Sequence, residues 1–221
     1  MKKLEIFPVI KEGVGLALVN YLSIVAAVAL YVLTIWIPYL NVGTTIAMNS
    51  IPAEMAKGSV INPLFIFESR FRRRMGEFFI MEAIMIMAIL IGFAFGFIPG
   101  IVLSYAWCLA SILFVDKERG ALESLRESNE LTYGNKWRIF GIEIILSIAL
   151  CIVVSIISAV FGAIGIDWLG MLLNLIVIVF FIPCLLGATA VIYNKLTNRD
   201  EEAAPAEPAK PAKAPKAPKA E

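Results

Sequence analysis

Two acidic side chains lie inside long apolar stretches of this sequence, where a charge is costly. Glu82 and Glu143 stand among apolar residues, and Asn20 has a similar place in an earlier stretch. An Asp, Lys or Arg at the middle of a membrane helix costs about 2.5–3.5 kcal/mol on insertion scales, so an ionisable residue there is a candidate for function. Counted from the glycine that precedes each stretch, all three residues fall in the same half of a helix.

Their similar depth has two interpretations. In the first, Asn20, Glu82 and Glu143 line one polar pocket that opens to the cytoplasm. In the second, each group reaches the headgroup layer or bonds a neighbouring helix by itself, as charged residues near helix ends commonly do. The second interpretation is the simpler one, and we favour it.

The sequence SYAWC at 104–108 adds two aromatic residues to this candidate pocket. Tyr105 and Trp107 lie deeper than an interfacial aromatic belt requires, and a buried Tyr hydroxyl or Trp N–H needs a partner. One interpretation is that they line a cavity for a lipid or another ligand. The ordinary expectation is that they pack against a polar residue such as Asn174.

A basic cluster, RFRRR at 70–74, is the candidate contact for lipid headgroups. Arg70, Arg72, Arg73 and Arg74 lie between two apolar stretches. Each Lys or Arg close to an anionic membrane surface gains about 1 kcal/mol. General anchoring explains this cluster as well as recognition of one particular lipid does, so we expect contact with membrane lipids without further specificity.

Residue types that support catalysis or metal binding are scarce. The sequence has no His, and Cys108, Cys151 and Cys184 each lie in an apolar stretch with no metal-binding spacing. A phosphate-binding loop and a nucleophile–base pair are also missing, and His is the commonest general base. We therefore expect no catalytic residue, no metal and no cofactor, and a protein that is not an enzyme.

The elements that position these residues are membrane helices. The chain is 60% hydrophobic, and its mean hydropathy is +0.84. Several stretches approach the ~20 apolar residues that cross a bilayer, and only helices or closed barrels satisfy the backbone there. The pattern predicts an all-α polytopic membrane helix bundle. The expected helices span 14–37, 77–97, 101–115, 139–164 and 168–193, with the sequence IPG at 98–100 as the turn of a hairpin.

Lys and Arg are confined to four segments, which alternate with turns that contain neither residue. The N-terminus holds three, 38–76 holds five, 116–138 holds five and the C-terminus holds six, which accounts for all 19. Basic segments face the cytoplasm, yet five helices would leave the N-terminal lysines outside. A sixth crossing at 39–58 removes the conflict, although a re-entrant or surface helix is the alternative there. We expect a multi-pass protein of the inner (plasma) membrane with both termini cytoplasmic.

Six helices would form three hairpins, each preceded by a cytoplasmic amphipathic segment at 6–13, 63–76 or 121–134. In the second segment Leu64, Phe67, Phe71 and Met75 recur at helical spacing, and in the third Leu122 and Leu125 share a face. Both read as interfacial helices. Residues 1–195 form the expected membrane domain. Residues 196–221, rich in Ala, Pro, Lys and Glu, form an expected disordered cytoplasmic tail.

The stretch IPGIVLSYAWCLASILFVDKERGALESLRESNELTYGNKWRIFGI carries a family resemblance. It resembles six-helix bacterial membrane proteins grouped with the glycerophosphoryl diester phosphodiesterase membrane domain, as does the later ATAVIYNKL. The resemblance implies a six-helix fold, and the chain has no room for the soluble barrel that performs hydrolysis in the namesake enzymes. The matching positions are Ala121, Leu122, Ser128, Leu131, Thr132, Gly134, Trp137, Arg138 and Phe140.

Two classes of function remain after these exclusions. The first is a non-enzymatic scaffold or regulatory membrane module whose partners are lipids and other membrane proteins. The second is a transporter or lipid-handling protein that uses the cytoplasmic polar pocket. A water-accessible cavity lined by Glu82 and Glu143 would favour the second, and a solid bundle would favour the first. No nucleic-acid partner is expected.

Overall fold

The computed structural model describes residues 3–58 and 60–203, and this part of the chain is helical with no strand. The elements are α1 (Ile6–Thr34), α2 (Pro38–Ala56), the 3₁₀ turn η1 (Pro63–Phe67), α3 (Arg70–Arg73), α4 (Met75–Phe95), α5 (Phe97–Ala106), α6 (Ala110–Asp116), α7 (Ala121–Thr132), α8 (Lys136–Ile164) and α9 (Asp167–Ala203). The all-α class expected from the sequence is confirmed.

Five segments of the described chain are long and apolar enough to cross a membrane. They are Ile6–Thr34, Met75–Phe95, Phe97–Asp116, Lys136–Ile164 and Asp167–Thr197. This agrees with a multi-pass membrane protein. The first begins eight residues earlier than expected, so the separate amphipathic segment at 6–13 is wrong: these residues are the opening turns of α1.

Helix α2 is the sixth helix that the charge pattern required, but it is not one of these five segments. It lies in the centre of one apolar core, where Ile46, Ala47, Ile51 and Met55 are fully buried. Most of its polar side chains donate to backbone carbonyls one turn earlier in α2. The Thr44 hydroxyl is also hydrogen-bonded to the Thr34 hydroxyl of α1 at 3.0 Å. Other helices shield α2, which allows it a polar composition. That it crosses the membrane stays a prediction.

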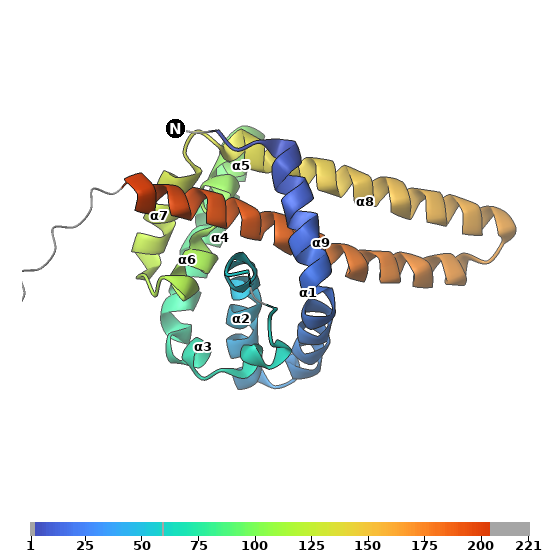
Figure 1. The fold of residues 1–221 in the computed structure, drawn as a ribbon, viewed down its shortest axis with the longest axis horizontal. Helices are drawn as coiled ribbons and strands as arrows, with labels where there is room; N and C mark the ends of the chain where they lie inside the picture. Colours follow the sequence, from blue (N-terminus) through green and yellow to red (C-terminus); the bar gives the residue numbers. More distant parts are fainter. Residues whose placement is uncertain (1–2, 59, 204–221) are drawn as a thin grey trace, which may run out of the picture.

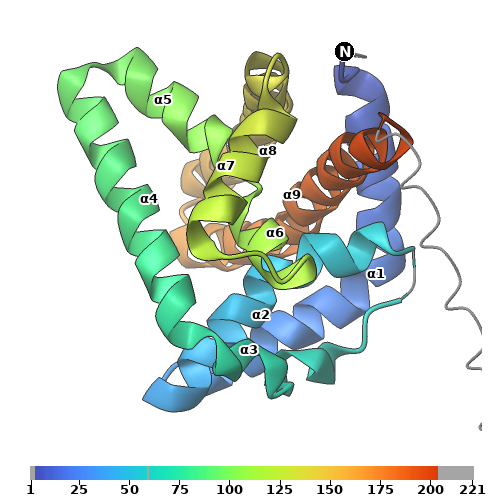
Figure 2. The ribbon, with the colours of Figure 1, turned by 90° about the vertical axis from the view of Figure 1, so that its left-hand side faces the viewer.

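Three short turns join α1 to α2, α4 to α5 and α8 to α9, and the three hairpins point in different directions. Figure 1 shows α8 and α9 extending together to one side, with α1 running across α9 instead of alongside it. We use "the base" for the connecting segments η1, α3, α6 and α7 together with the start of α1 and the end of α9. In Figure 2, α7 lies beside the junction of α5 and α6 within this base.

The crossing of α1 over α9 depends on small residues. A Cβ added to Gly13 would lie 2.7 Å from the backbone of Ala188, and one added to Gly187 would overlap the Gly13 carbonyl. Ala17 and Ala188 are buried at the same crossing. Helix backbones approach this closely only where side chains are small, so these residues determine how the first and third hairpins are joined.

Glycine backbone conformations fix two of the turns. Gly96 has φ 154° and separates α4 from α5, and Gly165 has φ 78° and ends α8. Both values disfavour residues that carry a Cβ. The hairpin turn expected at 98–100 therefore lies earlier: Pro99 stands in the first turn of α5, where the missing N–H has no helical partner to lose.

The amphipathic helix expected at 63–76 is wrong. The segment breaks into η1, an extended residue at Glu68, and the single turn α3. Phe65 and Phe71 are buried, while Leu64 is 61% exposed. The spacing that suggested one helical face therefore joins residues from three different elements, η1, α3 and α4.

The helix expected at 121–134 is confirmed as α7, but its buried face differs from the expected one. Leu125 is buried, whereas Leu122 is 69% exposed, because the face that packs inward is built around the hydroxyl residues Ser124, Ser128 and Thr132. The expected tail begins too early, since α9 continues to Ala203. Residues 204–221, which make up most of that tail, lie outside the described residues.

Candidate functional site

The polar residues of the apolar region gather around a break in the segment 97–116. Helix α5 ends at Ala106 and α6 begins at Ala110, so this span is interrupted within its apolar sequence. The Ser128 hydroxyl donates to the Ala106 carbonyl (2.8 Å) and accepts from the Leu109 amide (3.2 Å). An unpaired backbone group is expensive away from water, so α7 supplies the partners that the broken helix lacks.

Thr132 supports the same contact one turn further along α7. Its hydroxyl donates to the carbonyl of Ser128 at 2.8 Å and lies 3.3 Å from that of Ala106. Ser128 and Thr132 are both fully buried. We call Ala106, Leu109, Ser128 and Thr132 the break cluster.

The two candidate acids lie on either side of this break and bond different halves of the span. The Tyr105 hydroxyl of α5 donates to Glu143 of α8 at 2.8 Å. The Ser111 hydroxyl of α6 donates to Glu82 of α4 at 2.7 Å. Each carboxylate therefore has its own hydroxyl partner, and the two pairs connect α4 and α8 to the broken span between them.

Asn20 and Trp107 do not join these pairs. Asn20 is buried, accepts from the Ile61 amide at 3.0 Å and donates to the carbonyl of Leu16 at 3.1 Å, so it fastens the chain before η1 to α1. Trp107 is half-buried against the core around α2. Asn20, Glu82 and Glu143 therefore bond three different sets of partners and do not line one shared pocket. Asn174 is not the partner of Tyr105, since it bonds Ser158.

A small recess lies beside the Tyr105–Glu143 pair. Its volume is about 10 Å³, and Ile101, Val102, Tyr105, Lys136, Trp137 and Phe140 line it. The rings of Tyr105 and Phe140 meet edge to face with centroids 5.5 Å apart. A cavity of this size holds about one water molecule, so it does not accommodate a substrate.

Most of the arginine cluster is engaged within the protein. Arg70 pairs with Glu68 (2.6 Å) and Glu54 (3.2 Å). Arg74 pairs with Glu77 at 2.8 Å and donates to the carbonyls of Phe114 and Arg119. These two guanidinium groups therefore tie α3 and α4 to the ends of α2 and α6.

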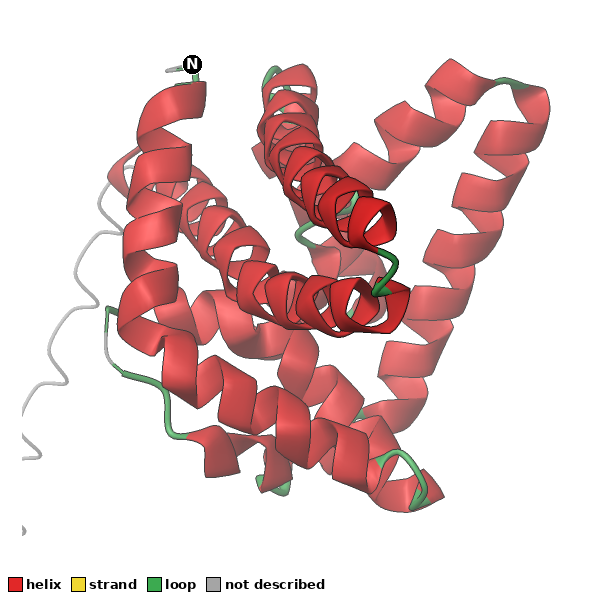
Figure 3. Ribbon diagram, turned by 90° about the vertical axis from the view of Figure 1, so that its right-hand side faces the viewer, coloured by secondary structure: helices red, strands yellow, loops and turns green. Residues whose placement is uncertain are grey.

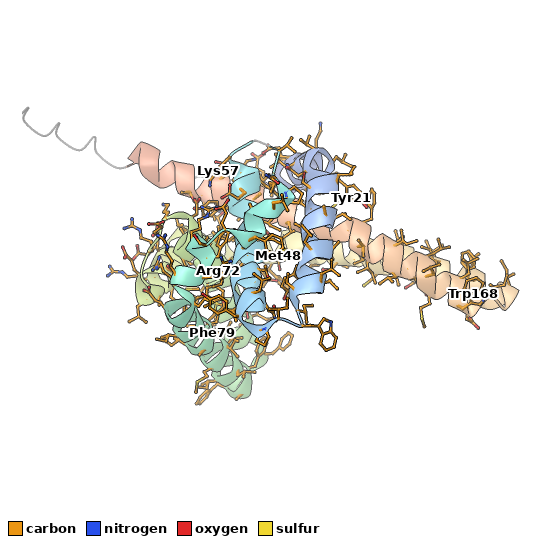
Figure 4. The ribbon with its side chains drawn as sticks, turned by 90° about the horizontal axis from the view of Figure 1, so that it is seen from below. Tyr21, Met48, Lys57, Arg72, Phe79 and Trp168 are labelled. Atoms are coloured by element: carbon orange, nitrogen blue, oxygen red, sulfur yellow. The ribbon has the colours of Figure 1, made fainter. Side chains whose placement is uncertain are left out.

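The other two arginines differ from each other. Arg72 donates to the carbonyl of Phe67 at 3.0 Å, and its methylene groups lie over α2, where a Cβ on Gly43 would meet them at 2.7 Å. Figure 4 labels Arg72 on the segment that lies against α2. Arg73 is exposed. Within the headgroup contact expected from the sequence, Arg70 and Arg73 are the exposed members, and only Arg70 is held in ion pairs among the described residues.

An ionic network that the sequence analysis missed joins three elements at the base. Asp116, at the end of α6, accepts from the Tyr193 hydroxyl at 2.6 Å and lies 3.4 Å from Lys57. Burial lowers the pKa of Lys57, but the hydrogen bond and charge of Glu54, with the charge of Asp116, outweigh it and raise the pKa above its usual value. Lys57 therefore stays charged throughout the neutral range.

The N-terminal segment is also fixed at the base. The Leu4 amide donates to Asn135 Oδ1 at 2.9 Å, and Arg138 donates to the Leu4 carbonyl at 2.5 Å. The Leu4 side chain is buried in an apolar cluster that also contains residues of α6, α7, α8 and α9. Ser128, Thr132 and Arg138, which are among the residues that carried the family resemblance, thus all form contacts between distant segments. No family model, curated protein or solved structure matches this chain.

Proposed function

We propose that this protein is a non-enzymatic membrane module that organises lipid and membrane-protein partners through its base. The pairing of Glu82 with Ser111 and of Glu143 with Tyr105 carries this proposal. Each acid is satisfied by one hydroxyl from the broken span, so both stabilise the packing around that span. A solid, internally paired core is what a scaffold requires, whereas a transporter requires polar groups that remain open to a solute.

The base is the part that faces the cytoplasm in this proposal. Lys and Arg lie in the base segments and termini and are missing from the three hairpin turns, which is the charge asymmetry of a cytoplasmic face. Exposed Trp36, Phe95 and Trp168 at the turns suit the opposite interface. The N-terminal contact of Leu4 with Asn135 and the ion pair of Lys195 with Glu12 support both ends lying on one side.

Partner binding at the base is assigned to the outer face of α7. This face presents Leu122 at 69% exposure beside the ion pairs Arg119–Glu123 and Arg126–Glu130. An exposed apolar side chain among charges is typical of a protein-binding surface that must also remain soluble. Lipid organisation is assigned to Arg73 and the neighbouring membrane surface.

Site-specific photo-crosslinking tests the proposal in intact membranes. A photoreactive residue at Leu122 should form a discrete protein adduct, and one at Ile152, on the exposed apolar side of α8, should form lipid adducts instead. In parallel, proteoliposomes that contain the protein should transfer lipids and small solutes no faster than empty liposomes. Transfer that is lost in Glu143→Gln, with no protein adduct at Leu122, would establish the transporter alternative.

A further inference from the structure

A cavity lies between the outer halves of α8 and α9, far from the base. Its volume is about 240 Å³, and its walls are Ser158, Phe161, Asp167, Gly170, Met171 and Asn174. Figure 3 looks at the molecule from the end of this hairpin, and together with Figure 1 it shows the outer half standing apart from the other helices. The cavity is therefore formed by the hairpin alone.

Oxygen acceptors gather in this cavity. Asn174 donates from Nδ2 to the Ser158 hydroxyl at 2.8 Å, while its Oδ1 atom is buried with no hydrogen-bond partner among the described residues. Asp167 lies seven positions before Asn174 on α9, which places both residues on one face of that helix. A buried amide oxygen without a donor is costly, so the site calls for a ligand that brings N–H or O–H groups.

The charge of the hairpin selects a cation. The nearest Lys or Arg along the chain are Arg138 and Lys195, 29 and 28 residues from Asp167, or roughly 40 Å along either helix at 1.5 Å per residue. The hairpin itself therefore provides no basic side chain to neutralise Asp167. The positive end of the α9 dipole stabilises the Asp167 carboxylate, but it leaves Asn174 Oδ1 without a donor.

The depth of the cavity indicates where such a cation would come from. Helix α8 has 29 residues, about 43 Å of helix, whereas the hydrocarbon layer of a bilayer is about 30 Å thick. Trp168 at the hairpin tip is 70% exposed, and Figure 4 shows it at the far end of the molecule. Exposed Trp residues lie at headgroup level, so the cavity opens close to that level, within reach of lipid headgroups.

We propose that this cavity binds the primary ammonium group of an aminophospholipid headgroup, such as phosphatidylethanolamine. Asp167 pairs with the ammonium charge, and the oxygens of Ser158 and Asn174 accept its N–H groups. Phe161 and Met171 contact the methylene groups. A divalent cation fits less well, because Ca²⁺ takes six to eight oxygen ligands and no group of three or more His, Cys, Asp or Glu occurs in the described residues.

Lipid retention by the full chain in nanodiscs tests this site. Nanodiscs of phosphatidylcholine with a minor fraction of phosphatidylethanolamine are extracted with mild detergent, and the lipids that stay with the protein are measured by mass spectrometry. We expect enrichment of phosphatidylethanolamine over phosphatidylcholine, whose quaternary ammonium has no N–H to donate. Asp167→Asn should weaken this retention about tenfold, as expected for loss of one charge-assisted contact.

Matched variants separate the site from general effects of charge. Glu5→Gln removes an exposed carboxylate at the base and should leave retention unchanged, and Asp167→Glu should restore most of it. Equal retention by the wild type and a folded Asp167→Asn variant overturns the proposal. A second outcome would overturn the claim that the amine comes from a lipid. In that outcome the retained lipids are not enriched in phosphatidylethanolamine, while soluble ethanolamine stabilises the protein in nanodiscs of pure phosphatidylcholine. None of these outcomes bears on protein binding at α7.

Discussion

At the scale of single residues, each acid in the apolar region has one hydroxyl partner. Glu143 accepts from Tyr105 and Glu82 accepts from Ser111. Because the pairs share no member, they should behave as independent contributions to stability. Interhelical hydrogen bonds in membrane proteins average about 0.6 kcal/mol and reach about 1.7 kcal/mol.

A double-mutant cycle tests this pairing. We expect Glu143→Gln and Tyr105→Phe to show a coupling energy of about 0.6–1.7 kcal/mol in the free energy of unfolding in detergent. Combined substitutions of Glu82 and Glu143 should be additive within about 0.5 kcal/mol. Strong coupling between the two acids would mean that they do share a pocket.

At the scale of elements, α7 repairs the break between α5 and α6. Ser128 bonds both the carbonyl of Ala106 and the amide of Leu109. One turn earlier on the same face, Ser124 is equally buried, but its hydroxyl has no hydrogen-bond partner within the described chain. The two serines therefore form a matched pair that differs only in what the hydroxyl contacts.

Ser128→Ala should lower the free energy of unfolding by about 1–3 kcal/mol, because the buried Leu109 amide loses its partner and the Ala106 carbonyl keeps only the longer bond from Thr132. Ser124→Ala should be neutral or slightly stabilising, since it removes an unpaired polar group. The free energy of unfolding is measured in detergent for both variants. The rate of proteolytic cleavage within 107–109 is then compared between them. Equal effects of the two substitutions would show that the hydroxyl of Ser128 does not hold the break.

At the scale of the whole molecule, the α1–α9 crossing joins the first and third hairpins. Gly187→Ala places a methyl group against the Gly13 carbonyl, whereas a methyl group on Gly15 meets nothing within 4 Å. We expect Gly187→Ala to destabilise by about 1–3 kcal/mol, the usual cost of overpacking. Gly15→Ala should stabilise by about 0.5–1 kcal/mol, because Ala is the better helix former. Thermal unfolding of both variants in one detergent makes the comparison.

Orientation is also a property of the whole molecule. In a chain with Cys108, Cys151 and Cys184 replaced by Ala, we expect Lys3→Cys to resist a membrane-impermeant thiol reagent added outside intact cells. Trp168→Cys at the α8–α9 turn should react, because the turn faces away from the basic base. External labelling at Lys3→Cys would contradict six crossings and leave α2 as a re-entrant or surface helix.

The sequence by itself determined the membrane class, the long apolar spans, the hairpin turns and the existence of α7. These features follow from local patterns: apolar length sets the spans, glycine and proline mark the turns, and periodicity predicts the α7 helix. It could not set the buried face of α7, because the inward residues Ser124, Ser128 and Thr132 are polar and a hydrophobic pattern assigns them to solvent.

Only the tertiary structure decided the break at 107–109 and the partners of the candidate residues. The segment 101–115 is mostly apolar and predicts one continuous helix. The hydroxyl of Ser128, about twenty residues further along the chain, satisfies the backbone groups that the break exposes. The same holds for Glu82 and Glu143, whose partners lie on other helices. A local pattern fixes which residues must find a partner, but the packing of distant helices chooses it.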